Sequence, residues 1–325
     1  MTCSPEPWAG GHAPGELASM LIMPSRRQVL TGAAGLAALG AGAGLYGGAV
    51  EPAWRLVVTP YAPRPANWPR ALSLRIAALA DFHVGEPWMS LGRVEEIVAA
   101  TNALAPDLVL LLGDYPGARP VALRRVALAD FAKRLASLRA PLGVHAVLGN
   151  HDWWDDAAAQ ARRRGPVEAR RVLEAQGITV LENAALRLVK DGQPFWLAGL
   201  ADQEPFVPQG LWHGLADIPG TLAAVTDDAP VILMAHEPDI FPQVPGRVAL
   251  TLAGHTHGGQ VRLLGHSPVT ASRFGQRYVY GHVVENGRHL VVSGGLGLSR
   301  IPVRLGVPPE IVLVRLTGAA AGAQV

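Results

Sequence analysis

The stretch LRIAALADFH, residues 74–83, shows the pattern that decides the fold of this chain. The mostly apolar run Leu74–Ala80 predicts a buried strand, and two polar side chains, Asp81 and His83, follow where the run stops. Side chains two residues apart in an extended segment point to the same face, so Asp81 and His83 could bind one ion. A single Asp-x-His pair occurs in many polar loops, so its meaning depends on the rest of the chain.

Four further apolar runs end in the same way, each followed by an Asp, Asn or His. These stretches are Gly113-Asp114, Gly149-Asn150-His151-Asp152, His236 and Gly254-His255-Thr256-His257. In open α/β sheets, ligands bind beyond the carboxyl ends of the strands, so we expect the five stretches to meet at one edge. Five such stretches in order are what a two-metal phosphoester-cleaving site requires.

The chemistry of each candidate suits a particular role. Asp114 follows an apolar strand, where an isolated carboxylate is too costly, and its two oxygens make it the natural bridge between two cations. Asn150 offers a neutral oxygen ligand, while His255 and His257 repeat the two-residue spacing. His151 need not bind metal, because a histidine that titrates near neutral pH can lie over the substrate as a proton donor.

Other residues near these stretches are open to two interpretations. Asp152 could orient His151, or it could cap the helix that is predicted to follow. Four residues could contribute to the site or serve ordinary local packing and turns: Trp153, Trp154, Glu237 and Asp239. Six histidines lack ligand spacing and are interpreted as surface or structural residues: His12, His145, His213, His266, His282 and His289.

The order of apolar and amphipathic segments indicates an α/β fold. Eight runs are predicted to be strands: Leu74–Ala80, Leu108–Leu112, Val144–Leu148, Phe195–Ala198, Val231–Ala235, Val248–Ala253, Leu290–Val292 and Ile311–Leu316. Three segments have helical spacing: 91–104, Val121–Leu138 and Asp155–Gln176. We expect one domain with two packed sheets and helices outside, although the pattern alone would equally fit a single doubly wound sheet.

Composition excludes several classes of protein. A chain of 325 residues, half of them hydrophobic and 17% charged, has ample material for a core and is not globally disordered. The net charge is only +2 and shows no basic stripe, so no nucleic-acid groove is expected. The single cysteine, Cys3, excludes an internal disulfide and a thiolate metal site.

The N-terminal region has the features of an export signal. The arginine pair Arg26-Arg27 precedes an uncharged, Gly/Ala-rich run from Val29 to Val50, which resembles a twin-arginine signal. A plain membrane anchor is the alternative, because about 20 apolar residues can span a bilayer. Cleavage near Ala41-Gly42-Ala43 stays open, and Met23 could be the true start of translation.

Together, the five stretches resemble the calcineurin-like metallophosphoesterase superfamily over residues 72–316. The string 254–260, Gly295-Leu296-Gly297 and Ile301-Pro302-Val303-Arg304 resemble its exported bacterial branch, in which twin-arginine signals occur. The resemblance implies a four-layer α/β/β/α double β-sandwich with a dinuclear metal site in the loops after the strands. The expected parts are a signal or anchor in 1–50, a connecting segment in 51–71, a catalytic domain in 72–318 and a tail in 319–325.

The resemblance also implies a distribution of ligands. It assigns Asp81, His83 and His257 to one metal, Asn150, His236 and His255 to the second, and Asp114 to both. His151, with Asp152, would serve the leaving oxygen. Tyr115-Pro116 departs from the common pattern of the superfamily, which puts transfer of substrate by analogy in doubt.

The resemblance to the exported branch implies a phosphodiesterase, which would use two divalent ions (Mn, Fe or Zn) and a hydroxide that bridges them. Its substrate would be an envelope lipid, a polymer or a small phosphoester. The protein would leave the cytoplasm through the twin-arginine machinery and act in the periplasm or, if tethered, on the outer face of the cytoplasmic membrane. One alternative is a pyrophosphatase acting on a lipid-linked or nucleotide-sugar diphosphate. Another is a metal-binding interaction module without catalysis.

Overall fold

The computed structural model describes residues 25–117, 120–207 and 214–319. The chain divides into two compact units, Met1–Gly42 and Ala43–Val325. The expectations for Cys3, His12, Met23, His213 and residues 320–325 of the tail lie outside the described residues.

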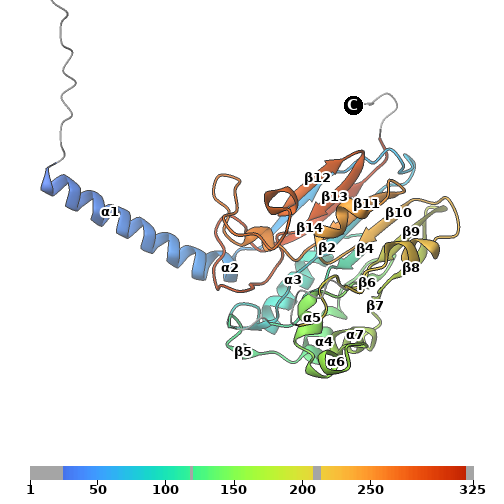
Figure 1. The fold of residues 1–325 in the computed structure, drawn as a ribbon, viewed down its shortest axis with the longest axis horizontal. Coiled ribbons are helices and arrows are strands. Elements are labelled where there is room, and N and C mark those ends of the chain that lie inside the picture. The colour runs from blue at the N-terminus through green and yellow to red at the C-terminus, as the bar shows by residue number, and fades with distance from the viewer. Residues whose placement is uncertain (1–24, 118–119, 208–213, 320–325) are drawn as a thin grey trace, which may run out of the picture. The chain divides into compact units, whose positions relative to one another are not determined.

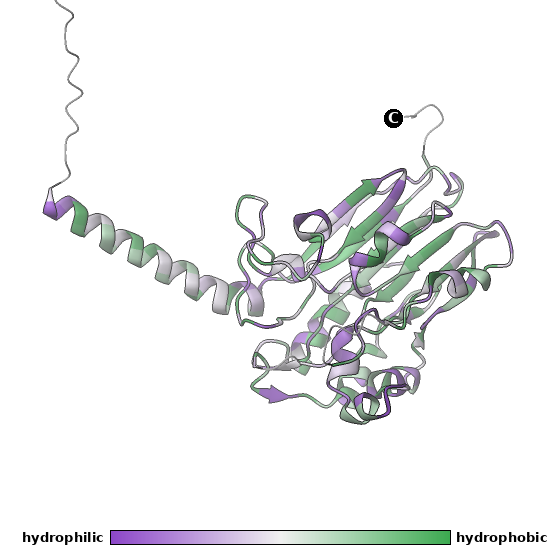
Figure 2. Ribbon diagram, viewed as in Figure 1, coloured by the Kyte–Doolittle hydropathy of each residue, from purple (hydrophilic) through white to green (hydrophobic). Residues whose placement is uncertain are grey.

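The first described element is the apolar helix α1, Arg26–Leu45, none of whose side chains is buried. It continues through the π-helical turn η1, Tyr46–Val50, into α2, Glu51–Trp54. By length and composition alone, Arg26–Trp54 could cross a membrane, a property that signal sequences near an N-terminus share. Figure 2 shows the hydrophilic colour of α1 confined to its first turn.

Two six-stranded sheets form the centre of the second unit (Figure 1). The first sheet has the order β1-β14-β2-β4-β6-β7. Its strands are β1 Val57–Tyr61, β2 Leu74–Leu79, β4 Leu108–Leu111, β6 Val144–Ala146, β7 Thr179–Val180 and β14 Glu310–Leu316. The second has the order β12-β13-β11-β10-β9-β8. Its strands are β8 Ala184–Lys190, β9 Gln193–Gly199, β10 Val231–Met234, β11 Val248–Ala253, β12 Gly281–Glu285 and β13 Arg288–Val292.

Three apolar clusters show how the layers are stacked. One lies between the sheets, where Ile76 and Leu110 of the first sheet share a core with Leu197 and Leu252 of the second. The outer face of the first sheet is covered by helices that include α3 Leu91–Ala103, α4 Leu128–Leu135 and α7 Glu168–Glu174. The outer face of the second is covered by α8 Ile218–Ala223 and the 3-10 helices η2 Pro238–Gln243 and η4 Gly275–Tyr278. The α/β/β/α arrangement is therefore confirmed, and a single doubly wound sheet is wrong.

The remaining elements are short and lie near the loops of the site. They are β3 Gly85–Glu86, β5 Arg124–Arg125, α5 Asn150–Trp154, α6 Ala157–Arg162 and the 3-10 turn η3 His257–Gly259. Two of the predicted helices are therefore shorter than expected. The segment Val121–Leu138 contains β5 before α4 begins. Asp155–Gln176 is divided into α6 and α7 around Gly165-Pro166, because proline has no N–H to continue a helix.

The segment 51–71 does more than connect. Its strand β1 pairs in parallel with β14, and Trp68 is buried between the sheets against Phe195. Sequence pattern did not indicate β1, β8 or β12, which lie at sheet edges and have alternating or partly exposed side chains.

Candidate metal centre

The carboxyl ends of five strands bring the five polar stretches together. Asp81 follows β2 and Asp114 follows β4, while Asn150 begins the helix after β6. His236 and His255 follow β10 and β11 of the other sheet. The site therefore lies where both sheets end, as the order of the motifs predicts.

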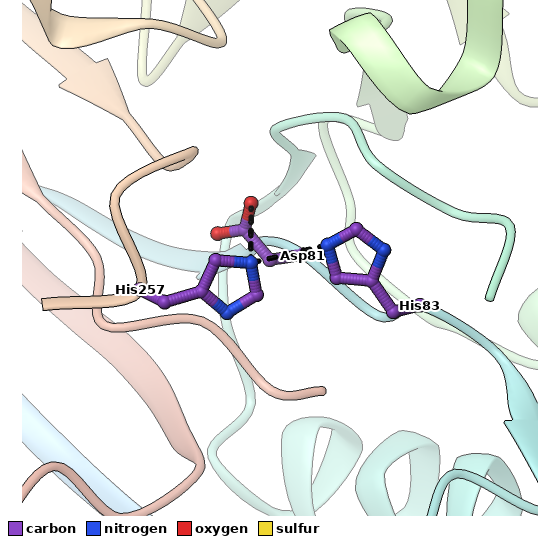
Figure 3. A group of neighbouring side chains, drawn as sticks. All are labelled: Asp81, His83 and His257. Carbon is purple, nitrogen blue, oxygen red and sulfur yellow. Dashed lines mark hydrogen bonds and ion pairs between the residues drawn. The ribbon is translucent and has the colours of Figure 1, made fainter. Parts of the chain in front are cut away.

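One group of potential ligands consists of Asp81, His83 and His257 (Figure 3). The Nε2 atoms of the two histidines are 3.1 Å apart, and His257 Nε2 lies 3.8 Å from Asp81 Oδ1. All three residues are buried. His83 Nδ1 lies 3.0 Å from the carbonyl oxygen of Pro116 and is placed to donate to it, which leaves Nε2 with a free lone pair.

The second group consists of Asp114, His236 and His255, with Asn150 beside it. His236 Nδ1 lies 2.7 Å from the carbonyl oxygen of Leu112, so its Nε2 faces Asp114 Oδ2 at 3.3 Å. His255 Nδ1 and Asn150 Oδ1 are 2.9 Å apart.

Asp114 joins the two groups. Its Oδ2 lies 3.5 Å from His83 Nε2 in the first group and 3.3 Å from His236 Nε2 in the second. Its other oxygen, Oδ1, accepts a 2.8 Å hydrogen bond from the backbone N–H of His151. The carboxylate is thus held from one side, and its Oδ2 lies between the ligand atoms of both groups.

The backbone under these side chains is unusual. Five of them lie at positive φ, a region that costs energy for residues other than glycine: Asp81, His83, Asp114, His255 and His257. Gly149 has no room for a side chain, because a Cβ there would meet Asp114 Oδ1 and come within 2.7 Å of His236 Nδ1. Such strain concentrates at functional sites, where the surrounding fold holds it in place.

The electrostatics of the first group favour a cation. Burial raises the pKa of Asp81 to about 7, and burial lowers the pKa of His83 to about 4. Burial also lowers the pKa of His257 well below its usual value, which keeps both rings neutral, as a metal ligand must be. Asp81 Oδ1 accepts a hydrogen bond from the backbone N–H of His255, but Oδ2 is buried with no hydrogen-bond partner, so a positive ion would compensate this oxygen.

In the second group, His236 and Asp114 compensate one another. Burial alone would lower the pKa of His236, but the charge of Asp114 outweighs it and the pKa lies well above the usual value. Burial would likewise raise the pKa of Asp114, and His236 reverses the shift. A cation would replace the proton of His236 as partner of this carboxylate. The donor sets of both groups, with imidazole nitrogens and hard oxygens and no thiolate, fit Mn, Fe or Zn.

His151 lies beside the two groups and lines the cleft. Its ring packs edge-on against His83, with centroids 4.9 Å apart, and against Trp154 at 5.0 Å. Its Nδ1 lies 3.5 Å from Asp155 Oδ2. Burial would lower the pKa of His151, but Asp114 and Asp155 together raise it above its usual value, which favours the protonated ring.

Asp152 caps a helix, but this is the short helix α5, to which Asp152 itself belongs, and not the longer helix that was predicted to follow. Its carboxylate accepts hydrogen bonds from the backbone N–H groups of Gly149, Asp114 and Tyr115 at 2.8–3.1 Å. It stands at the third position of α5 and fixes the loops that carry Asp114 and Asn150. The carboxylate that faces His151 is Asp155, one helical turn further on, which the sequence analysis had not singled out.

Arg304 is a second residue that the sequence analysis did not place at the site. Its guanidinium is fully buried, donates to the carbonyl oxygens of Gly297 and Val307, and lies 3.2 Å from His257 Nδ1. Hydropathy does not indicate a buried arginine beside a candidate ligand such as His257, although Arg304 lies in the quoted motif 301–304.

A cleft of about 490 Å³ opens from the two groups to the surface. Beyond His151 and His255 its wall is formed by Trp154, Glu204, Gln260, Thr270, Ser272, Arg273, Arg300 and Ile301, among others. Trp154 thus lines the cleft, and its Nε1 donates to the Glu204 carbonyl at 2.7 Å, whereas Trp153 is buried against Phe206.

The remaining candidates lie away from the ligand groups or behind them. Glu237 is buried and accepts hydrogen bonds from Gln203, and Asp239 pairs with Arg273 at 3.3 Å. His145 is buried, with its Nε2 2.9 Å from the Leu142 carbonyl, and His282 stacks on His289 at the sheet edge. His266 closes a hairpin turn with Leu263.

Comparison with known proteins agrees with this geometry. The family described as calcineurin-like phosphoesterase matches residues 74–259. The Escherichia coli phosphodiesterase YaeI is 31% identical over 90% of this chain and 100% of its own length. The uncharacterized metallophosphoesterase YkuE of Bacillus subtilis is 30% identical over 90% of this chain and 97% of its own. A zebrafish (Danio rerio) transmembrane protein with a metallophosphoesterase domain is 29% identical over 75% of this chain, which spans 53% of that protein. The chain belongs to the calcineurin-like phosphoesterase family and is a metal-dependent phosphohydrolase with two candidate metal-binding clusters.

Proposed function

We propose that this protein is a phosphodiesterase that binds two divalent cations and hydrolyses an envelope-associated phosphodiester outside the cytoplasm. The observation that carries the proposal is the position of Asp114, whose Oδ2 lies 3.5 Å from His83 Nε2 and 3.3 Å from His236 Nε2. One carboxylate between two sets of nitrogen and oxygen donors is the arrangement expected of a two-metal phosphoester site.

In this proposal, Asp81, His83 and His257 would hold the first cation. Asn150, His236 and His255 would hold the second, and Asp114 would serve both. When bound, the cations supply Lewis acidity that activates water and neutralises charge on the phosphoryl oxygens. The choice among Mn, Fe and Zn depends on supply as well as on ligands.

His151 is the proposed general acid. As water adds to phosphorus and the bond to the leaving oxygen breaks, the ring delivers its proton to that oxygen. Asp155 faces Nδ1 at 3.5 Å and orients the ring, while Trp154 packs against the ring in a tilted arrangement. Asp152 acts indirectly, because its three backbone hydrogen bonds hold the loops of Asp114 and Asn150 in place.

The proposed location is the periplasm or, if α1 is retained, the outer face of the cytoplasmic membrane. Support comes from the arginine pair Arg26-Arg27 at the start of α1 and from the exposed apolar helix that follows. The twin-arginine machinery carries folded proteins, which would allow the cations to be loaded before export. The name of the zebrafish relative places that protein in a membrane, and we extend a membrane setting to this chain.

One observation favours a second candidate, a pyrophosphatase on a lipid-linked or nucleotide-sugar diphosphate. Arg273 and Arg300 line the cleft beyond the metal ligands, where a second phosphate of a diphosphate would lie. Arginine presents a planar fork of donors that matches phosphate oxygens.

The test compares three soluble substrates with the metal-loaded protein: bis-p-nitrophenyl phosphate, p-nitrophenyl phosphate and a nucleotide-sugar diphosphate. Faster turnover of the diester than of the monoester supports the phosphodiesterase. Cleavage of the diphosphate alone would replace it with the pyrophosphatase. Turnover of only the monoester would contradict both.

A further inference from the structure

The rim of the cleft exposes large apolar side chains. Ten large hydrophobic residues are exposed outside α1 in the described part of the chain, and four of them belong to the loops at the cleft mouth. We call these four the apolar rim: Leu263, Leu264, Val269 and Ile301. Val269 and Ile301 also line the cleft itself. Exposed apolar residues that gather around a binding site mark an interaction surface more often than isolated ones do.

Leu264 is the most unusual member of the rim. Leu263 and His266 exchange two backbone hydrogen bonds of 2.9 Å, which closes a hairpin with two central residues, Leu264 and Gly265. Both have positive φ, +50° and +81°, as in a type I′ turn. The leucine side chain is 107% exposed, so it makes no packing contact that would offset the unfavourable backbone.

The same chain contains two such turns with favourable residues. The β8–β9 hairpin turns through Asp191-Gly192 and the β12–β13 hairpin through Asn286-Gly287, again with positive φ at all four positions. Asp-Gly and Asn-Gly are the preferred pairs for this turn. Both of these turns precede strands that run parallel to β10 and β11, so they lie at the opposite end of the sheet from the site. Only the turn beside the site, among these three, exposes a leucine.

The loop that carries Ile301 of the apolar rim is hydrogen-bonded to the segment that follows the apolar helix α1. Gly47, two residues beyond α1, accepts a 2.8 Å hydrogen bond from the backbone N–H of Arg304. Leu305 in turn pairs with Val261 and donates to Gln260, which lines the cleft. Glu51 of α2 likewise accepts a 2.9 Å hydrogen bond from the backbone N–H of Val307, so α2 lies against the loop after β13 (Figure 1). If α1 lies in a bilayer, the loop that contains Arg304 and Ile301 lies near the surface of that bilayer, because this loop is bonded to Gly47 just beyond α1.

We propose that the apolar rim docks on a lipid bilayer, with Leu264 inserted among the lipids and the cleft open toward the membrane surface. The lipid surface is favoured as occupant because the helical segment Arg26–Trp54, which could cross a membrane by length and composition, contacts the loop of the rim residue Ile301 through the hydrogen bond between Gly47 and Arg304. The consequence for substrate choice rests on the proposed phosphodiesterase function, but the docking does not. Through docking, the enzyme would take phosphodiesters whose lipid chains stay in the membrane.

The test uses the full-length protein in vesicles of phosphatidylethanolamine and phosphatidylglycerol. Cys3 is changed to serine, and a Leu264→Cys variant is labelled with an environment-sensitive fluorophore. The matched control carries Asn286→Cys in the corresponding turn at the far end of the sheet. We expect a blue-shifted emission and quenching by brominated lipid for the label at position 264, and neither for the label at position 286. Equal, water-like emission from both labels would overturn the proposal.

A kinetic measurement then separates docking from catalysis. Leu264→Asn preserves the turn and removes the apolar group, and Leu264 does not line the cleft. We expect this variant to cleave a vesicle-bound long-chain alkyl p-nitrophenyl phosphate several-fold more slowly than the parent, with unchanged turnover of bis-p-nitrophenyl phosphate. Unchanged rates on both substrates contradict docking. Failure of the parent to cleave either diester contradicts the proposed function instead, and the fluorescence result still decides the docking.

Discussion

Two parts of the cleft break opposite rules of protein structure. One is the floor, by which we mean the two groups of potential metal ligands, and the other is the apolar rim. At the floor, charged and titratable side chains such as Asp81 and Asp114 are fully buried, and Asp81 Oδ2 lacks a hydrogen-bond partner. At the rim, Leu264 is fully exposed in a backbone conformation that suits asparagine or glycine. A folded chain tolerates such violations where a bound partner offsets their cost. Bound cations would offset the cost of the buried carboxylates at the floor, and an apolar environment would offset the cost of the exposed leucine at the rim.

Because the floor and the rim differ in this way, substitutions in them should affect different properties of the protein. Changes at the floor should remove cations or proton transfer and therefore affect every substrate equally. Changes at the rim should leave the chemistry intact and affect only where the enzyme acts. Substitutions at the metal ligands should therefore have larger effects on turnover than substitutions in the apolar rim.

Asp114→Ala should have the largest effect. It removes the one carboxylate that lies between both ligand groups and leaves His236 without its buried partner. We expect loss of bound metal by elemental analysis and no measurable turnover of any substrate. Asp130→Ala, on the exposed face of α4, is the control and should retain both. Full metal content in Asp114→Ala would show that the carboxylate does not bridge.

His151→Ala should lower turnover by about 10²–10⁴-fold, the usual contribution of a general acid. The ring lines the cleft and is not a member of either ligand group, so metal content should not change. The measurement combines kcat with elemental analysis of the same sample. Loss of metal in this variant would reassign His151 from the substrate to the cations.

Gly149→Ala should damage the floor through packing alone. The new Cβ would meet Asp114 and come within 2.7 Å of His236 Nδ1, so the ligands must shift. We expect a loss of about 1–3 kcal/mol in the free energy of unfolding, together with weaker metal binding. Gly92→Ala, in the first turn of α3, meets nothing closer than 3.8 Å and should be neutral or slightly stabilising. Equal metal affinity in both variants would argue against a rigid floor.

Leu264→Asn should have the smallest effect on the soluble protein, and of the opposite sign. Asparagine tolerates positive φ better than leucine, so we expect a gain of about 0.5–1 kcal/mol in stability without lipid. The reciprocal change, Asn286→Leu, should destabilise by a similar amount. Thermal unfolding of the two variants measures both, and a loss of stability in Leu264→Asn would show that the leucine is structural.

Much of the floor could be predicted from the sequence because its signal is local. A ligand that follows an apolar run shows both the strand and its end, and β2, β4, β10 and β11 begin as predicted. The positions of Asp81, Asp114 and His236 at those ends follow from the topology of the sheets. The two-sheet architecture itself came from the family resemblance, because apolar strands alone do not show how many sheets they form.

The parts that could not be predicted depend on contacts between distant segments. Arg304 reaches His257 only because the loop after β13 folds over the site. The carboxylate beside His151 belongs to Asp155, because α5 directs the side chain of Asp152 toward the backbone of Gly149. The apolar rim was missed for a different reason. The sequence shows that Gly265 follows Leu264, but only the backbone shows that these two residues form the centre of a tight turn.

The central claim is that the floor binds two cations through a shared Asp114, and its most direct test is a metal count. The protein, purified from Ala43 onward and so without most of α1, should contain about two ions per chain by elemental analysis after reconstitution with Mn. His83→Ala and His255→Ala should each lose one of them, because the two histidines belong to different groups. A parent protein that binds no metal after reconstitution would contradict the account.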